Sequence, residues 1–127
     1  MILEHVALYV EELEKMKDFY IRFFHATAND KYHNPLTGLQ TYFLSFEGGA
    51  RLEIMQLPVM SPHESGEYPL GYAHISFKLG SIEEVDQLTT VLQESGHPLL
   101  NGPRMTGDGY YESVISDPEG NLIELVA

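Results

Sequence analysis

The sequence contains an internal duplication, and this feature constrains the fold more than any other. Leu3–Val10 and Gly71–Leu79 are both short runs of β-forming residues that carry one histidine near their start and precede an acidic, helix-like segment. A weaker similarity closes each half, because Gly49–Met55 and Gly120–Val126 are both apolar runs with a glutamate four residues after the glycine. A repeat of this kind indicates two copies of one structural module.

Hydrophobic periodicity predicts the elements of the first half. Residues 3–10 are expected to form a strand. From Leu13 onward apolar residues recur at helical spacing, which is typical of an amphipathic helix packed on a sheet. His25 and the polar residues after it end this helix. Residues 41–46 and 51–57 are predicted strands joined by a glycine turn.

The second half repeats this order. Residues 72–79 are a predicted strand, and Ser81 begins a capping box at the start of a helix whose apolar stripe runs from Ile82 to Leu92. The remaining predicted elements are a strand at 98–100, a glycine-rich loop at 102–109, and strands at 110–116 and 122–126.

Each half is therefore expected to be a strand–helix–strand–strand–strand (βαβββ) module, which makes the fold α+β. We expect modules 1–57 and 71–127 to be joined by the proline-rich linker 58–70 into a single domain of residues 1–127. The two sheets, each with a helix on its outer face, are expected to curl around a shared cavity. One histidine and one glutamate of each half would face that cavity.

The composition narrows the classes of partner. The chain has a formal charge of −12, whereas nucleic acids and anionic membrane surfaces are bound through clustered Lys and Arg. No apolar run approaches the ~18–20 residues of a membrane-spanning helix, and there is no cysteine for disulfides or thiolate metal sites. These features predict a cytoplasmic protein that binds a small molecule and neither nucleic acid nor membrane.

The repeated positions predict a metal site. His5, Glu53, His74 and Glu124 together supply two imidazoles and two carboxylates. Such a set of nitrogen and oxygen ligands suits a divalent ion such as Zn, Ni, Co or Fe. A cation would also relieve the repulsion between two carboxylates held close together. Taken singly, each histidine could be a hydrogen-bonded strand residue and each glutamate a solvent-facing one, so the metal hypothesis depends on the repetition.

Several segments of the chain resemble one known family. They are Glu4–Val10, Lys17–Tyr20, Ala73–Phe77 and Asp117–Leu125. Through these segments the chain resembles, over essentially its whole length, the vicinal oxygen chelate superfamily, which groups glyoxalase I, bleomycin-resistance proteins and extradiol dioxygenases. The resemblance implies a pair of βαβββ modules with metal ligands on the first and last strands of each.

The resemblance assigns the ligands to His5, Glu53, His74 and Glu124. This His, Glu, His, Glu set looks most like bacterial glyoxalase I. The trio His5, His74 and Glu124 would also satisfy the pattern of extradiol dioxygenases and fosfomycin-resistance enzymes.

The chain departs from the glyoxalase I pattern at two positions that usually contact glutathione. Tyr9 stands where the family usually has an Arg, and Leu57 stands where it often has an Asn. The resemblance therefore implies a substrate that is smaller or less anionic than a glutathione adduct.

We expect a metal-dependent enzyme similar to lactoylglutathione lyase, with lyase or isomerase chemistry on a small oxygenated substrate. Zn, Ni or Co is the expected ion, with Fe or Mn as the other options. By resemblance, Glu124 is the first and Glu53 the second candidate for the general base. The candidate substrate contacts are Tyr9, Lys78, Arg104 and Tyr111.

Two other functions fit the same family. A metal-free protein of the bleomycin-resistance type would hold its ligand by apolar burial in the cavity. An Fe(II) extradiol dioxygenase would instead act on a catechol. The open sheet edges of such modules predict a homodimer.

Overall fold

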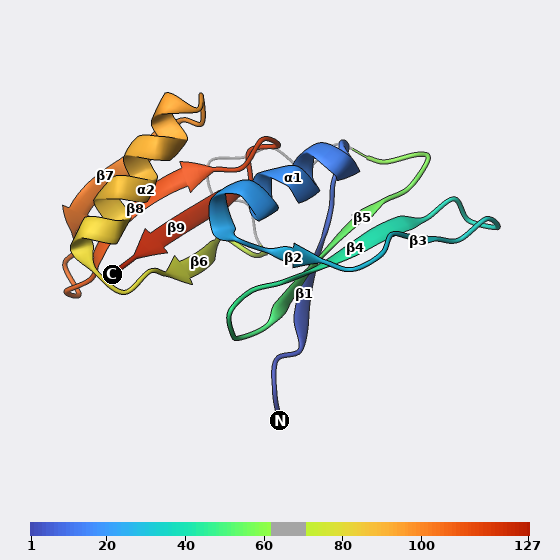
Figure 1. The fold of residues 1–127 in the computed structure, drawn as a ribbon, viewed down its shortest axis with the longest axis horizontal. Coiled ribbons are helices and arrows are strands. Elements are labelled where there is room, and N and C mark those ends of the chain that lie inside the picture. The colour runs from blue at the N-terminus through green and yellow to red at the C-terminus, as the bar shows by residue number, and fades with distance from the viewer. Residues whose placement is uncertain (62–70) are drawn as a thin grey trace. The chain divides into compact units, whose positions relative to one another are not determined.

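The computed structural model describes residues 1–61 and 71–127 of the chain. The chain divides into two compact units, Met1–His63 and Glu64–Ala127. Each unit is a β-sheet with one helix packed on it, so the α+β class and the duplicated βαβββ order are confirmed (Figure 1). Of the predicted linker 58–70, residues 62–70 lie outside the described residues, and the single-domain organisation stays a prediction.

The first unit has a mixed sheet in the strand order β1-β5-β4-β2, with β3 also paired to β4. Its elements are β1 (His5–Tyr9), α1 (Leu13–Phe24), β2 (Thr27–Ala28), β3 (Tyr32–His33), β4 (Gln40–Ser45) and β5 (Arg51–Gln56). Strand β1 runs parallel to β5, whereas β4 runs antiparallel to β2, β3 and β5.

The second strand of the first module was not predicted, because its sequence is polar. The structure divides it into two short pieces, β2 and β3, along the edge of β4. Between them Asn29 continues the pairing: its backbone N–H donates to the Phe43 carbonyl at 3.1 Å, and its side-chain oxygen accepts from the Phe43 N–H at 2.7 Å. Pairing with β4 therefore sets the conformation of a segment whose own composition favours a turn.

The core of the first unit lies between α1 and the sheet. Helix α1 contacts β4 and β5, and its apolar stripe is buried as predicted. His25 ends the helix in the left-handed conformation, with φ 53°. The buried side chains of α1 are Leu13, Met16, Phe19, Tyr20, Phe23 and Phe24. The sheet residues buried with them include Leu44, Leu52 and Ile54.

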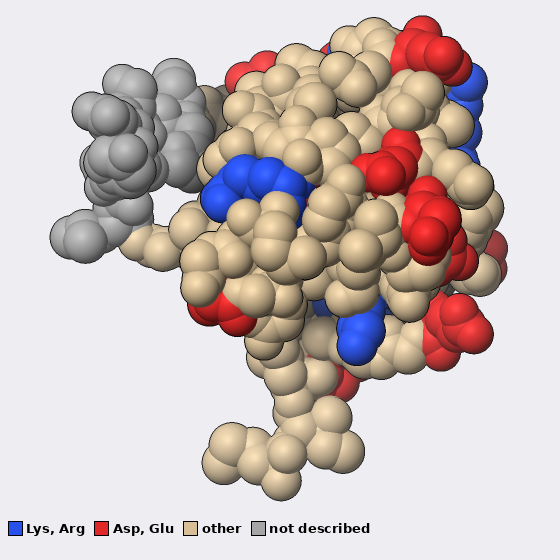
Figure 2. Space-filling view, turned by 90° about the vertical axis from the view of Figure 1, so that its left-hand side faces the viewer, with Lys and Arg blue, Asp and Glu red and all other residues tan. Residues whose placement is uncertain are grey.

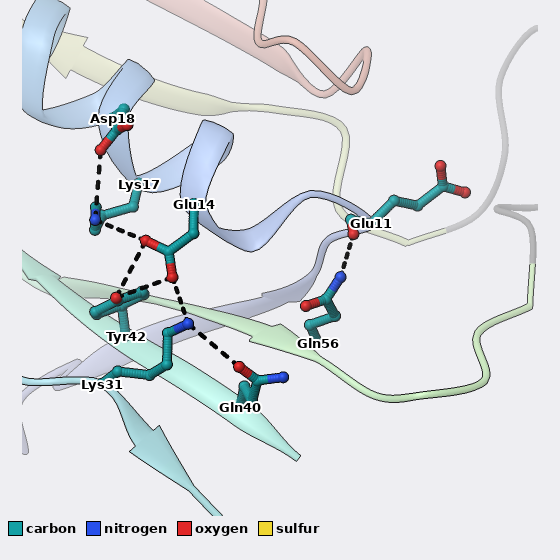
Figure 3. Close-up of polar contacts among 8 residues, drawn as sticks. All are labelled: Glu11, Glu14, Lys17, Asp18, Lys31, Gln40, Tyr42 and Gln56. Atoms are coloured by element: carbon teal, nitrogen blue, oxygen red, sulfur yellow. Dashed lines mark hydrogen bonds and ion pairs between the residues drawn. The ribbon is translucent and has the colours of Figure 1, made fainter. Parts of the chain in front are cut away.

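Polar contacts also bind the start of α1 to the sheet (Figure 3). The Glu14 carboxylate lies 2.7 Å from Lys17 Nζ and 2.5 Å from Lys31 Nζ, and it accepts a hydrogen bond from the Tyr42 hydroxyl. Hydrogen bonds from the two lysines lower the pKa of the Glu14 carboxyl from 4.5 to about 2. The Gln56 amide, on β5, donates to the backbone oxygen of Glu11 just before the helix.

The second unit repeats the arrangement with the strand order β6-β9-β8-β7. Its elements are β6 (Ile75–Lys78), α2 (Ile82–Glu94), β7 (Leu99–Met105), β8 (Tyr111–Ser116) and β9 (Leu122–Val126). Strands β6 and β9 are parallel, as β1 and β5 are in the first unit. The predicted N-cap is confirmed, because the Ser81 hydroxyl accepts from the Glu84 N–H at 3.2 Å.

Helix α2 buries part of the predicted stripe, Val85 and Leu92, together with a polar residue. Ile82 is exposed, whereas Thr89 is buried on the same face of the helix as Val85 and Leu92. Its hydroxyl is satisfied there, since it donates to the Val85 carbonyl and lies 2.6 Å from the Ser113 hydroxyl. A polar residue can therefore occupy the apolar stripe when two partners meet its hydrogen-bonding needs.

Strand β7 extends further than predicted, through Gly102 and Arg104 to Met105. The glycine-rich segment does not end the strand but makes irregularities in its pairing with β8. Gly102 has φ +80°, and a Cβ there would lie 2.6 Å from the Glu112 carbonyl oxygen, so the close approach of the two strands requires glycine. The turn is reduced to the residues after Met105, and Arg104 becomes a strand residue.

Candidate functional site

The two sheets present one His–Glu pair each, at the same place in the strand pairing. In the first unit, Ala7 of β1 lies opposite Glu53 of β5, two residues after His5. In the second unit, Ser76 of β6 lies opposite Glu124 of β9, two residues after His74. Alternate strand residues share a face, so each histidine shares a sheet face with its glutamate. The repeat seen in the sequence is thus a repeat of register.

The first pair, His5 and Glu53, lies on the sheet face that also carries Phe43. His5 Nε2 is 3.7 Å from Glu53 Oε2, and the His5 ring meets the Phe43 ring edge-on at 5.4 Å. Glu4 accepts a hydrogen bond from His5 Nδ1 and pairs with the Arg51 guanidinium. The hydrogen bond from His5 and the contact with Arg51 lower the pKa of the Glu4 carboxyl.

The second pair is closer, with His74 Nε2 3.1 Å from Glu124 Oε2. Glu124 is carried by the hairpin of β8 and β9, whose turn is organised by the buried Asp117. The Asp117 carboxylate accepts from the N–H groups of Glu119 and Asn121 at 2.9 Å each, and from the Asn121 amide. These bonds hold the turn and thereby the register that brings Glu124 beside β6.

The donor atoms of the two pairs lie near the spacing of two ligands bound to one metal ion. Two donors bound to one ion at about 2.1 Å, at an angle of 90–110°, lie about 3.0–3.4 Å apart. The His74–Glu124 separation of 3.1 Å lies within that interval, and the His5–Glu53 separation of 3.7 Å lies outside it. Imidazole nitrogen with carboxylate oxygen also suits a borderline divalent ion. The second pair therefore has the spacing of two ligands of one ion, whereas the first pair is wider than that spacing.

A pair is not a complete site. Within residues 1–61, and likewise within residues 71–127, no three His, Asp or Glu side chains are grouped so that they could hold a metal ion. Structural and catalytic zinc sites use three or four protein ligands. A metal centre would therefore need ligands beyond either pair alone, and the four-residue site stays a prediction.

The second unit carries a pocket of about 660 Å³ next to its pair. It lies over the sheet face of Ser76 and Glu124 and is bordered by the turn between β7 and β8. Its lining is His74, Ser76, Arg104, Thr106, Gly107, Asp108, Tyr110, Glu112, Glu124 and Val126.

The pocket lining is more acidic than basic. Arg104 is its one Lys or Arg, whereas Asp108, Glu112 and Glu124 are carboxylic acids. The Arg104 guanidinium is 3.5 Å from Glu112, which offsets part of its charge. The Thr106 hydroxyl and the Asp108 backbone donate to the Asp108 carboxyl and lower its pKa. The lining thus favours polar, uncharged substrate groups over a multiply anionic substrate.

Of the four predicted substrate contacts, one lines the pocket and three do not. Arg104 lines the pocket. Tyr9, at the end of β1, shares the face of His5 and is 56% exposed. Lys78 shares the face of Ser76 but does not line the pocket. Tyr111 points to the helix side of the sheet, where its hydroxyl donates to Asp86 at 2.7 Å, and this bond raises the pKa of Tyr111.

Glu112 and Tyr110 are among the pocket residues that sequence reasoning missed. Strand alternation could have found Glu112, because it lies one residue before Ser113 and three before Ile115, which are buried under α2, and it must therefore face the other way. Tyr110 could not be found in this way, since it lies in the turn before β8.

On the described part of the face in Figure 2, Lys and Arg side chains form small separate groups with acidic side chains among them. Among the described residues, neither helix is long and apolar enough to cross a membrane.

Comparisons with known proteins extend over nearly the whole chain. Residues 2–125 match the model of the Glyoxalase/Bleomycin resistance protein/Dioxygenase superfamily. The chain is 30% identical to the uncharacterized protein YqjT of Bacillus subtilis (strain 168) over 130 residues, which cover 98% of both chains.

Two solved structures are also similar. One is the glyoxalase family protein from Enterococcus faecalis, with 27% identity, a TM-score of 0.77, and 98% of this chain and 95% of that chain covered. The other is a mutant of the fosfomycin resistance protein FosX from Listeria monocytogenes, solved in complex with Mn(II) and a dihydroxypropylphosphonic acid. It shares 25% identity, with a TM-score of 0.77 and coverage of 98% and 90%.

Proposed function

Because the chain belongs to the Glyoxalase/Bleomycin resistance protein/Dioxygenase superfamily, we propose that it is a metal-dependent enzyme with lyase or isomerase chemistry on a small oxygenated substrate. The proposed ligands are His5, Glu53, His74 and Glu124. The observation that carries the proposal is the identical register of the two His–Glu pairs, each with its donor atoms 3.1–3.7 Å apart.

The ion would be Zn, Ni or Co, with Fe or Mn as the other options; Mn(II) is present in the complex of the FosX relative. When bound, it would polarise a carbonyl or hydroxyl oxygen of the substrate. Glu124 is the proposed general base and Glu53 the second candidate. Their side chains are 20% and 16% exposed, so each is sheltered from bulk water but open to a ligand.

The pocket of the second unit is the proposed substrate site. Arg104 and the hydroxyls of Ser76, Thr106 and Tyr110 offer hydrogen bonds to substrate oxygens. The acidic lining, with Tyr9 and Leu57 at the positions that contact glutathione in glyoxalase I, supports a small hydroxylated or carbonyl substrate rather than a glutathione adduct.

Metal loading tests this proposal directly. The protein is dialysed against Zn, Ni, Co, Mn or Fe(II), analysed for bound metal, and unfolded by heat. An ion present at about 100 times its Kd stabilises by about 2.7 kcal/mol, which corresponds to an increase of about 10 °C in Tm for a chain of this size. If no ion is bound stoichiometrically and none raises Tm, the metal proposal is rejected in favour of a metal-free binding protein.

Activity is then measured on hydroxy ketones, vicinal diols and a glutathione hemithioacetal. We expect Glu124→Gln to lower turnover by about 100-fold or more, because the amide cannot accept the substrate proton. Glu83→Gln, on the exposed first turn of α2, is the matched control and should leave turnover unchanged. A fully active Glu124→Gln variant would remove Glu124 as base. Oxygen uptake with catechols and Fe(II) would instead identify a dioxygenase.

We also propose that the protein is a homodimer. Strand β1 in the first sheet, and β6 and β7 in the second, are the terminal strands of their own sheets, and unpaired strand edges favour association. Light scattering after size-exclusion chromatography measures the mass, and a mass near 14.4 kDa would contradict the dimer.

A further inference from the structure

Glu4 contacts His5 and is itself held by Arg51. We call this pair, Glu4 and Arg51, the brace of His5; neither residue is a proposed metal ligand. Glu4 and His5 are consecutive, and consecutive residues of a strand point to opposite faces. Glu4 instead lies just before β1, and its carboxylate turns back to accept a hydrogen bond from His5 Nδ1. Its backbone carbonyl accepts from the Arg51 N–H at 2.9 Å, so the main chain is held at this point too.

Arg51 holds the Glu4 carboxylate in place. Its Nε donates to Glu4 Oε1 at 2.6 Å, and a second guanidinium nitrogen contacts the same oxygen. The guanidinium lies 4.1 Å from the centre of the Phe43 ring, and the His5 ring contacts that same ring. Arg51 is also the strand partner of His5. The three side chains therefore form a chain of contacts from Arg51 through Glu4 to His5 on one aromatic floor.

This arrangement selects one form of the His5 ring. An ionised carboxylate can only accept hydrogen bonds, so the Nδ1 that contacts Glu4 carries the proton. In the neutral ring Nε2 is then an acceptor with a free lone pair. It lies 3.7 Å from Glu53 Oε2, which is also an acceptor and too far for a hydrogen bond. Two acceptors directed at a common space are an arrangement that a cation satisfies.

The second half of the repeat lacks the brace. Ala73 precedes His74 where Glu4 precedes His5, and Leu122 precedes Glu124 by two residues where Arg51 precedes Glu53. Within residues 71–127, no side chain hydrogen-bonds to His74 Nδ1. The brace is therefore not a requirement of the fold, and His74 is an internal reference for it.

We propose that Glu4, held by Arg51, is a positioning residue that keeps His5 in the Nδ1–H tautomer and in the orientation that presents Nε2, beside Glu53, to a metal ion. The proposal rests on the proposed function in its last step, the binding of the ion by His5. Carboxylates that contact the far nitrogen of a ligating histidine orient the ring and raise its basicity, and their loss weakens metal binding about 10–100-fold.

The tautomer is tested without any metal. Long-range ¹H–¹⁵N spectra of the metal-free protein at pH 8 report which ring nitrogen of each histidine carries the proton. We expect Nδ1–H for His5 in the parent protein and a shift toward Nε2–H in Glu4→Ala, with the His74 signals unchanged. Glu4→Gln should retain Nδ1–H, because its amide oxygen still accepts. A parent His5 protonated on Nε2 or on both nitrogens, or an unchanged ring in Glu4→Ala, overturns the proposal.

Metal affinity tests the second step. Titration against a chelator with known affinity for Zn should show binding weakened about 10–100-fold in Glu4→Ala, less in Glu4→Gln, and unchanged in the turn variant Glu47→Gln. Equal affinities for Glu4→Ala and the parent overturn the positioning role. If the parent protein binds none of Zn, Ni, Co, Mn or Fe(II), the proposed function is refuted, and so is the step in which His5 binds the ion. The tautomer of His5 is still decided by the spectra.

Discussion

Glu14 is the side chain whose removal the structure allows us to follow most closely. The substitution Glu14→Gln keeps the size of the side chain and its ability to accept from the Tyr42 hydroxyl. It removes the negative charge between Lys17 and Lys31, whose ammonium groups also lie 5.0 and 5.7 Å from the centre of the Tyr42 ring (Figure 3). The variant is left with two cations near one ring and no carboxylate between them.

The size of the effect follows from the pKa and the exposure. A decrease in the Glu14 pKa from 4.5 to about 2 corresponds to a ceiling of about 3 kcal/mol. The side chain is 51% exposed, and exposed ion pairs contribute only about 0.2–1 kcal/mol each because water and salt screen them. With two lysines at 2.5 and 2.7 Å, we expect a loss of about 1–1.5 kcal/mol in the free energy of unfolding at pH 7.

The effect must depend on pH in one direction. Because folding lowers the Glu14 pKa, its stabilisation is complete above the unfolded value of 4.5 and is lost as the pH falls from there through about 2. The difference between the parent and Glu14→Gln should therefore be constant from pH 7 to pH 5. By pH 3 it should be less than half of its value at pH 7.

Urea unfolding at pH 7, 5, 4 and 3 measures these differences. Glu47→Gln, in the exposed turn before β5, is the matched control, since Glu47 makes no side-chain hydrogen bond or ion pair with the described residues. We expect the control to stay within about 0.5 kcal/mol of the parent. A Glu14→Gln variant as stable as the control at pH 7, or a difference that persists undiminished at pH 3, would refute the reasoning. In 1 M NaCl the difference should shrink.

Two further substitutions probe the second unit by urea unfolding. Thr89→Val leaves the buried Ser113 hydroxyl without its partner and should lower the free energy of unfolding by about 1–3 kcal/mol. Adding Ser113→Ala should restore part of that loss. A double variant no more stable than Thr89→Val would contradict this. Gly102→Ala places a Cβ 2.6 Å from the Glu112 carbonyl oxygen at φ +80° and should cost about 1–3 kcal/mol. The control Gly107→Ala meets no atom within 4 Å and should cost less; equal losses would show that the close approach is unimportant.

The sheet register explains why the two His–Glu pairs could be predicted and the pocket lining could not. His5 and Glu53 were paired with His74 and Glu124 through the repeat, and a repeated sequence gives repeated strand pairing. Tyr111 was the predicted substrate contact on this strand, but it shares the face of the buried Ser113 and lies on the helix side, where its hydroxyl donates to Asp86. Which face of β8 packs on the helix depends on contacts between distant segments.

Short polar segments were the least predictable part of the fold. The strand at Thr27–Ala28 and Tyr32–His33 exists because β4 offers an edge to pair with, and Asn29 bridges to Phe43 with its side chain. Strand β7 passes through Gly102 for a similar reason, since pairing with β8 outweighs the local preference for a loop. In both places backbone hydrogen bonds to a neighbouring strand decide a conformation that local propensity opposes.

The contacts of Glu4 and Arg51 with His5 are another feature that depends on segments far apart in the sequence. Glu4 and Arg51 are 47 positions apart, and nothing in their spacing indicates that both reach one imidazole. The sequence by itself determined the α+β class, the duplication, the amphipathic helices and the repeated His–Glu pairs, because these depend on periodicity and repetition along the chain. Only the tertiary structure decided which carboxylate contacts which histidine nitrogen and which side chains line the pocket. Those contacts depend on strand register, a property of two segments together that neither encodes alone.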